Sequence, residues 1–118
     1  MKPLRFAPLA SALLAAIGTV ALGAAIATTS PGAPRSGEQV VQYQCVLCHG
    51  AGVGGAPKIG DGRAWSARAP VGIDNLVRSA TKGRGAMPPS GGLSDLSEPE
   101  LRAAIAYMLR RSGIEPRD

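Results

Sequence analysis

Both cysteines of this 118-residue chain and its only histidine lie in one stretch of five residues, Cys45-Val46-Leu47-Cys48-His49. Two thiols three positions apart, with an imidazole beside the second, form the attachment signature for a c-type haem. On one turn of helix, each thiol can reach one vinyl group of the porphyrin and form a thioether, while His49 can bind the iron from one face. The stretch therefore predicts one haem c, attached through Cys45 and Cys48 and ligated by His49.

Three other kinds of site use the same residue types. A zinc site needs about four protein ligands, and this stretch supplies two thiols and one imidazole. A thioredoxin-like redox pair has the same spacing but normally follows a buried strand, which residues 37–44 do not resemble. A disulfide within one helical turn would close a very small loop and constrain almost nothing. These requirements favour haem attachment.

A haem iron that carries electrons without binding a gas or a substrate needs a sixth ligand, and a methionine thioether raises its reduction potential. The candidates beyond the first residues are Met87 and Met108. Met87 precedes Pro88 and Pro89, whose fixed φ angles stiffen a loop. Met108 lies on the apolar face of an expected helix, where core packing explains it. The sequence favours Met87 as the ligand; the alternative is that Met87 only covers an exposed haem edge.

The charge pattern excludes one class of partner. The net charge is +5, and Lys2 and Arg5 contribute two of the positive charges. From residue 28 onward eleven Lys and Arg stand against eight Asp and Glu, and the arginines are scattered. A nucleic-acid-binding surface would cluster them, so we expect no nucleic-acid partner.

Large apolar side chains are scarce beyond the first 27 residues. The aromatic residues there are Tyr43, Trp65 and Tyr107. A domain of about 80 residues with so few large side chains would be marginally stable by itself. A porphyrin buried in the core would supply the missing apolar area.

Residues 1–27 are typical of an export segment, because Lys2 and Arg5 are followed by an uncharged run rich in Ala and Leu. Ala25-Ile26-Ala27 fits the small-x-small pattern that precedes a cleavage site. The run is also just long enough to span a bilayer, which takes about 20 residues. We therefore expect a signal peptide or an uncleaved N-terminal membrane anchor. Either places the domain in the periplasm, soluble or anchored to the periplasmic face of the inner membrane.

The rest of the chain predicts a linker at residues 28–36 and then helices separated by loops. The expected helices span 37–48, 61–69 and 73–82, and the last opens after Ser97 and ends before Gly113. Ser36 and Ser97 are the expected N-caps of the first and last helices, and Glu100 completes a capping box with Ser97.

The first and last helices are expected to cross closely at Gly37 and Tyr107, with Tyr43 facing the partner helix. Residues 50–62 are rich in glycine but lack the Gly-Lys-Ser or Gly-Lys-Thr ending of a phosphate-binding loop. Close approach of the backbone to a flat ring explains those glycines better.

The order and spacing of these motifs resemble class I cytochromes c of the cytochrome c5 type, over about residues 36–112. The resemblance is carried by the Cys45–His49 stretch, Gly54-Gly55-Ala56-Pro57-Lys58-Ile59-Gly60-Asp61, the Trp65 segment, Gly85-Ala86-Met87-Pro88-Pro89 and Tyr107-Met108-Leu109. It implies an all-α, small class I cytochrome c fold, with three to five helices wrapped around one covalently bound haem. The monohaem domain would span residues 37–114 and residues 115–118 would form a tail.

The same resemblance implies the roles of individual residues. Cys45 and Cys48 would be the thioether donors, and His49 and Met87 the axial ligands. The carbonyl of Pro57 would accept a hydrogen bond from the second ring nitrogen of His49 and so fix its tautomer.

Two further residues, Trp65 and Arg84, are expected around the haem. Arg84 would guide acidic partners toward the exposed haem edge at modest ionic strength. The alternative for Arg84 is a solvated surface charge.

One departure from the resembled family concerns the loop after Met87. Many members of the c5 type carry a second cysteine pair there, and the corresponding positions here are Leu93 and Leu96. An apolar contact would then replace a disulfide, which bears on the rigidity of the loop and not on ligation.

The expected function is one-electron transport between membrane respiratory complexes or to a terminal oxidase, without enzymatic activity. Two alternatives remain. One is a haem-based sensor or enzyme subunit that binds a small ligand after Met87 is displaced. The other is a thiol–disulfide exchanger that uses Cys45 and Cys48 without haem.

Overall fold

The computed structural model describes Pro3 and residues 32–118. The expected leader, apart from Pro3, and residues 28–31 of the expected linker therefore lie outside the described residues. Helices account for the regular structure of this part of the chain, and its β-type pairing is one isolated bridge between Arg84 and Met87. The expected all-α fold is confirmed. Within residues 32–118, none of the helices has the length and apolar character that crossing a membrane requires.

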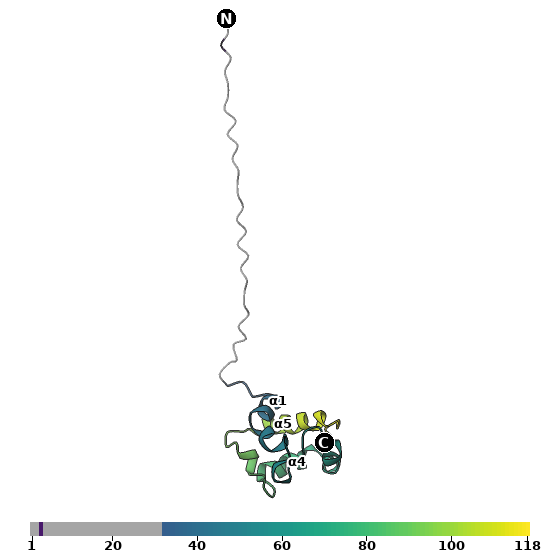
Figure 1. Ribbon diagram of the computed structural model, residues 1–118. Coiled ribbons are helices and arrows are strands. Elements are labelled where there is room, and N and C mark those ends of the chain that lie inside the picture. Colours follow the sequence, from purple (N-terminus) through teal and green to yellow (C-terminus); the bar gives the residue numbers. More distant parts are fainter. Residues whose placement is uncertain (1–2, 4–31) are drawn as a thin grey trace.

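Nine helical elements follow one another along the described chain (Figure 1). The α-helices are α1 (Gly37–Val40), α2 (Val46–His49), α3 (Gly62–Ser66), α4 (Ile73–Lys82) and α5 (Glu98–Arg111). The shorter elements are the π-helical η1 (Val41–Cys45) and the 3-10 turns η2 (Val53–Gly55), η3 (Ala69–Val71) and η4 (Pro89–Gly92).

The first predicted helix is present, but its middle is wider than an α-helix. α1, η1 and α2 are continuous from Gly37 to His49, and Ser36 caps them by accepting a hydrogen bond from the amide of Gln39. In a π-helix each amide reaches one residue further than in an α-helix. The expectation that Tyr43 faces the partner helix is wrong: Tyr43 is 71% exposed, and it lies in this π-helical segment, where successive side chains are set at other angles than in an α-helix.

The first and last helices cross closely, and Gly37 makes this possible. A Cβ atom at Gly37 would overlap the backbone oxygen of Ala103 and lie 2.9 Å from the amide nitrogen of Ala104. Across the same contact, the hydroxyl of Tyr107 donates to a carboxylate oxygen of Glu38 at 3.1 Å. The crossing expected at Gly37 and Tyr107 is confirmed.

Helix α5 forms the centre of the core, since it packs against both α1 and α4 (Figure 1). The predicted capping box is present, because Ser97 accepts from the amide of Glu100 and the Glu100 carboxylate accepts from the amide of Ser97. The buried apolar residues come mainly from these helices: Val40, Val41, Trp65, Ile73, Val77, Ala80, Leu101, Ala104, Ile105, Ala106, Met108 and Leu109. Leu93 and Leu96 are partly buried against this core.

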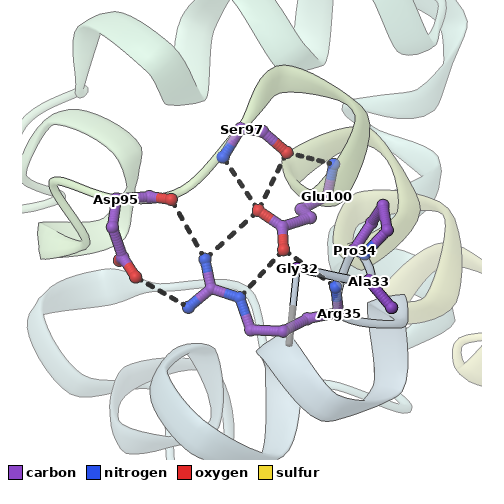
Figure 2. Close-up of a pocket in the computed structure, with 7 residues that line it drawn as sticks. All are labelled: Gly32, Ala33, Pro34, Arg35, Asp95, Ser97 and Glu100. Atoms are coloured by element: carbon purple, nitrogen blue, oxygen red, sulfur yellow. Dashed lines mark hydrogen bonds and ion pairs between the residues drawn. The ribbon is translucent and has the colours of Figure 1, made fainter. Parts of the chain in front are cut away.

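A polar cluster fastens Arg35, two residues before α1, to the start of α5 (Figure 2). Arg35 donates from Nε to one carboxylate oxygen of Glu100 at 2.9 Å and from Nη2 to the other at 3.2 Å. The side chain of Glu100 is buried, and its hydrogen bonds to Arg35 and Ser97 hold its pKa well below the usual range. Asp95 adds a second, exposed ion pair to Arg35 at 3.3 Å.

Residues 115–118, which we expected as a tail, lie against the start of α4. The amide of Ile73 donates to the carbonyl of Arg117 at 2.7 Å, and a Cβ atom at Gly72 would lie 3.2 Å from the carbonyl carbon of Asp118. The first amides of a helix have no hydrogen-bond partner within the helix, so the amide of Ile73 is free to donate to this carbonyl.

Candidate haem site

The attachment stretch lies where η1 passes into α2. Cys45 is the last residue of η1, Cys48 is in the final turn of α2, and both are free thiols. Cys45 is partly buried against the core, and this burial raises the pKa of its thiol. Cys48 is exposed. Both cysteines are thus on one continuous helical segment, as thioether attachment to a single porphyrin requires.

His49 ends α2 and is buried, with 8% of its surface exposed. Its Nδ1 atom lies 2.8 Å from the carbonyl oxygen of Pro57. Because a carbonyl oxygen can only accept, the hydrogen bond places the proton on Nδ1 and leaves the lone pair of Nε2 for a metal. This is the contact with Pro57 that the family resemblance implied.

The loop after the attachment stretch folds back and encloses His49 from a second side. The amide of Ile59 donates to the carbonyl of His49 at 2.8 Å. The ring of Trp65, from α3, stacks on the His49 ring with 5.8 Å between centroids and 29° between planes. Trp65 itself is held because its Nε1 donates to the carbonyl of Lys58 at 2.8 Å. The imidazole therefore has little freedom to rotate.

Met87 lies in a tight turn after α4. Its amide donates to the carbonyl of Arg84, and the amide of Arg84 donates to the carbonyl of Met87, both at 2.9 Å. Gly85 occupies the first central position of this turn with φ +56°, a conformation that suits glycine. Met87 is partly buried against the core. The amide and the carbonyl of Met87, the candidate sixth ligand, are thus both held by hydrogen bonds.

Glycines let the neighbouring backbone approach this turn. A Cβ atom at Gly83 would lie 2.7 Å from the carbonyl oxygen of Met87 and 2.9 Å from the nitrogen of Pro89. A Cβ atom at Gly54, in the loop after His49, would lie 3.0 Å from the Cβ of Ala86. The loop that follows His49 and the loop that carries Met87 therefore meet.

The other candidates occupy different surroundings. Met108 is 4% exposed in the core, on α5. Arg84 is exposed, and among the described residues its guanidinium takes part in none of the four ion pairs. The backbone of Arg84 pairs with Met87 and is therefore part of the site, independently of the role of its guanidinium.

The donors gathered here fit a c-type haem. Cys45 and Cys48 offer two thiols on one helical segment, and His49 offers an imidazole with its Nε2 lone pair available. Trp65 and the loop from Pro57 to Ile59 enclose the imidazole. Each of these groups has a function if a porphyrin binds at this place.

The chain is similar in sequence to known proteins. The family described as "Cytochrome C oxidase, cbb3-type, subunit III" matches residues 32–108. Cytochrome c5 of Ectopseudomonas mendocina is 46% identical over 84 residues, which cover 70% of this chain and 97% of that protein. Cytochrome c5 of Azotobacter vinelandii is 47% identical over 79 residues, covering 65% of this chain and 95% of that one.

A solved structure agrees with these relatives. The cytochrome c in the crystal structure of an electron transfer complex of nitrite reductase with cytochrome c is 46% identical, with a TM-score of 0.62. The match covers 64% of this chain and 93% of that chain. The chain therefore belongs to the class I monohaem cytochrome c family. It is a monohaem electron carrier with one covalently bound haem c, for which Cys45, Cys48 and His49 form the attachment motif.

Sequence reasoning missed several residues that organise the site. Gly83, directly after α4, admits the backbone of Met87 and Pro89. The carbonyl of Lys58 holds Trp65, and the side chain of Gln44 reaches the loop after Met87. These contacts join residues far apart in the chain or use backbone atoms, so residue type and spacing gave no signal for them.

Proposed function

We propose that this cytochrome carries single electrons with its haem iron held between Nε2 of His49 and the sulfur of Met87. The observation that supports this ligand pair best is the meeting of the two loops at Gly54 and Ala86. Ala86 directly precedes Met87, and the loop of Gly54 follows His49. A methionine in this place can bind the same iron as the histidine.

Met108 is a poorer candidate for the same role. It is almost fully buried among the apolar side chains of the core, where a long flexible side chain fills space. Met87, in contrast, is only partly buried and its backbone is fixed by the two hydrogen bonds to Arg84. A fixed backbone lowers the entropy lost when the side chain binds a metal.

The rival functions have less support. A thiol–disulfide exchanger needs a cysteine with a lowered pKa, whereas burial raises the pKa of the Cys45 thiol. A sensor needs a methionine that leaves the iron readily, whereas the turn that carries Met87 is held by Arg84 and packed against Gly83.

Bound haem supplies a one-electron couple, and the protein's task is to keep its surroundings constant in both oxidation states. The carbonyl of Pro57 and the ring of Trp65 hold the orientation of His49. The turn from Arg84 to Met87 would hold the second ligand. With both ligands held, little rearrangement would accompany the gain or loss of an electron by a bound haem.

The ligand pair is tested by Met87→Ala, with Met108→Leu as the control. We expect M87A to keep its covalent haem, to lose the weak Met-to-iron absorption of the oxidised protein, to have a lower reduction potential and to bind carbon monoxide when reduced. M108L should keep the absorption and the potential. An unchanged potential in M87A would contradict the assignment of Met87.

We also propose that the protein works in the periplasm in a respiratory chain. The support is the sequence of residues 1–27, whose two positive charges and long uncharged run are typical of an export segment. Mass spectrometry of the exported protein should find the haem adduct, and it distinguishes a chain that begins after Ala27 from one that retains its N-terminus as an anchor. A holoprotein recovered only from the cytoplasm would contradict this location.

Redox enzymes or respiratory complexes are the proposed partners. The similar cytochrome c in the solved complex is bound to nitrite reductase, which shows one such partner for that protein. Arg84, exposed beside the Met87 turn, is proposed to steer acidic partners. Arg84→Glu should slow electron transfer to an acidic partner at low ionic strength more than Arg111→Glu, which places the same change at the end of α5. Equal rates would leave Arg84 as a solvated surface charge.

A further inference from the structure

Gln44 links two parts of the site that lie 47 residues apart. It directly precedes Cys45, in η1, and its side-chain Nε2 donates to the carbonyl oxygen of Gly91 at 2.9 Å. This hydrogen bond is partly buried, and a Cβ atom at Gly92 would lie 3.3 Å from the same nitrogen. The segment that carries the haem thiols is thus fastened to the loop that follows Met87.

That loop contains one strained residue, Ser90. Ser90, Gly91 and Gly92 have φ angles of +51°, +64° and +86° in succession. Ser90 is the one non-glycine residue in this conformation within the described part of the chain. A non-glycine residue in this conformation persists only when its surroundings determine that conformation.

A displacement of this turn would reach Met87. Only Pro88 and Pro89 separate Met87 from Ser90, and proline fixes its own φ angle. The carbonyl of Pro88 also accepts from the amide of Gly91 at 3.0 Å, so the prolines and the turn form one unit. Gln44 binds this unit at Gly91, whereas Arg84 pairs with Met87 at the other end of the unit.

We propose that Gln44 is a positioning residue for Met87: its amide holds the strained turn at Ser90–Gly92 and thereby keeps the Met87 sulfur on the iron. The inference rests on the proposed ligation by His49 and Met87. The side-chain hydrogen bond of Gln44 goes to Gly91 and not to either ligand, so Gln44 acts through the turn and the two prolines.

The test is Gln44→Glu in the full-chain holoprotein. Glutamate has the same length, but its carboxylate cannot donate to the Gly91 carbonyl. Gln42→Glu is the matched control, since Gln42 is exposed in the same helical segment and receives the same charge. We expect carbon monoxide to bind the reduced Q44E protein about tenfold faster than wild type, because a part-buried acceptor loses its partner and the methionine leaves more often. The potential should fall as well, and Q42E should match wild type.

The outcomes separate this inference from the proposed ligation. If wild type lacks a Met-to-iron absorption, or M87A leaves it unchanged, the ligation itself is wrong. If M87A abolishes the absorption but Q44E and Q42E bind carbon monoxide at the same rate, Gln44 has no positioning role. A lowered unfolding midpoint in Q44E with an unchanged carbon monoxide rate would show a merely structural residue. Should Q44E yield no holoprotein, Q44M, of similar length and without a donor, is measured in the same way with the same expected result.

Discussion

Replacing Gly83 by alanine should disturb the candidate haem site more than its position at the end of α4 suggests. Gly83 has φ +81° and ψ 157°, a region that glycine alone adopts readily, so alanine there costs of order 1–3 kcal/mol. The added Cβ would also lie 2.7 Å from the carbonyl oxygen of Met87 and 3.0 Å from the carbonyl carbon of Pro88. Both are backbone atoms, which cannot turn aside as a side chain could, and overpacking typically adds about 1–3 kcal/mol.

Gly113→Ala is the matched control, because it measures the cost of placing alanine at a positive φ angle without an overlap of the added Cβ. Gly113 follows the last helix with φ +78°, and nothing lies within 4 Å of a Cβ built there. We expect G113A to lower the free energy of unfolding by about 1 kcal/mol. G83A should lower it by about 3 kcal/mol, since conformational strain and overlap act together.

The measurement is denaturant unfolding of the oxidised holoprotein, followed by helical circular dichroism and by the Met-to-iron absorption. In G83A the absorption should be lost at a lower denaturant concentration than the helical signal, because the displaced backbone belongs to Met87. In G113A the two signals should change together. If G83A were no less stable than G113A, and its two signals coincided, the contact between Gly83 and the Met87 backbone would be shown to have no energetic weight.

Three further changes test the framework around the site. Arg35 holds the pKa of Glu100 below its usual range, so this pair stabilises the fold above the unfolded carboxyl value of about 4.3 and the contribution is lost as the pH falls. Stability of the wild type should therefore fall more steeply from pH 5 to pH 3 than that of E100Q in thermal unfolding, and parallel curves would refute this. Gly37→Ala should cost about 1–3 kcal/mol in denaturant unfolding by forcing α1 away from α5; wild-type stability would mean that the helices separate freely. Trp65→Phe, which removes the indole N–H and leaves a smaller ring beside His49, should cost roughly 1–2 kcal/mol and broaden the haem-ligand resonances in nuclear magnetic resonance, whereas an unaltered spectrum would deny Trp65 a role in holding the imidazole.

Local signals in the sequence predicted most of the fold correctly. The capping boxes depend on residues three apart, so Ser97 and Glu100 marked the start of α5 without knowledge of the tertiary structure. The predicted span 73–82 matches α4, because the residue that ends this helix, Gly83, directly follows it in the sequence. The attachment motif is local too, which is why the haem could be inferred from five residues.

Tertiary contacts were harder to predict. The position of Tyr43 was predicted wrongly because a π-helical turn changes the angle between successive side chains, and nothing in the composition of residues 41–45 announces it. The hydrogen bond from Gln44 to Gly91 joins two distant segments, and a glutamine before a cysteine has no characteristic meaning. The ion pair of Arg35 with Glu100 likewise depends on how the linker leaves the domain (Figure 2).

The turn that carries Met87 is held by three separate parts of the chain. Gly83 packs against it from the end of α4, the loop of Gly54 meets Ala86, and the side chain of Gln44 binds the residues that follow. Two of these contacts are close approaches at a glycine, and the third is a hydrogen bond. Their shared effect is to oppose movement of this loop. If Met87 binds the iron as proposed, the three contacts would keep its sulfur at a constant position in both oxidation states.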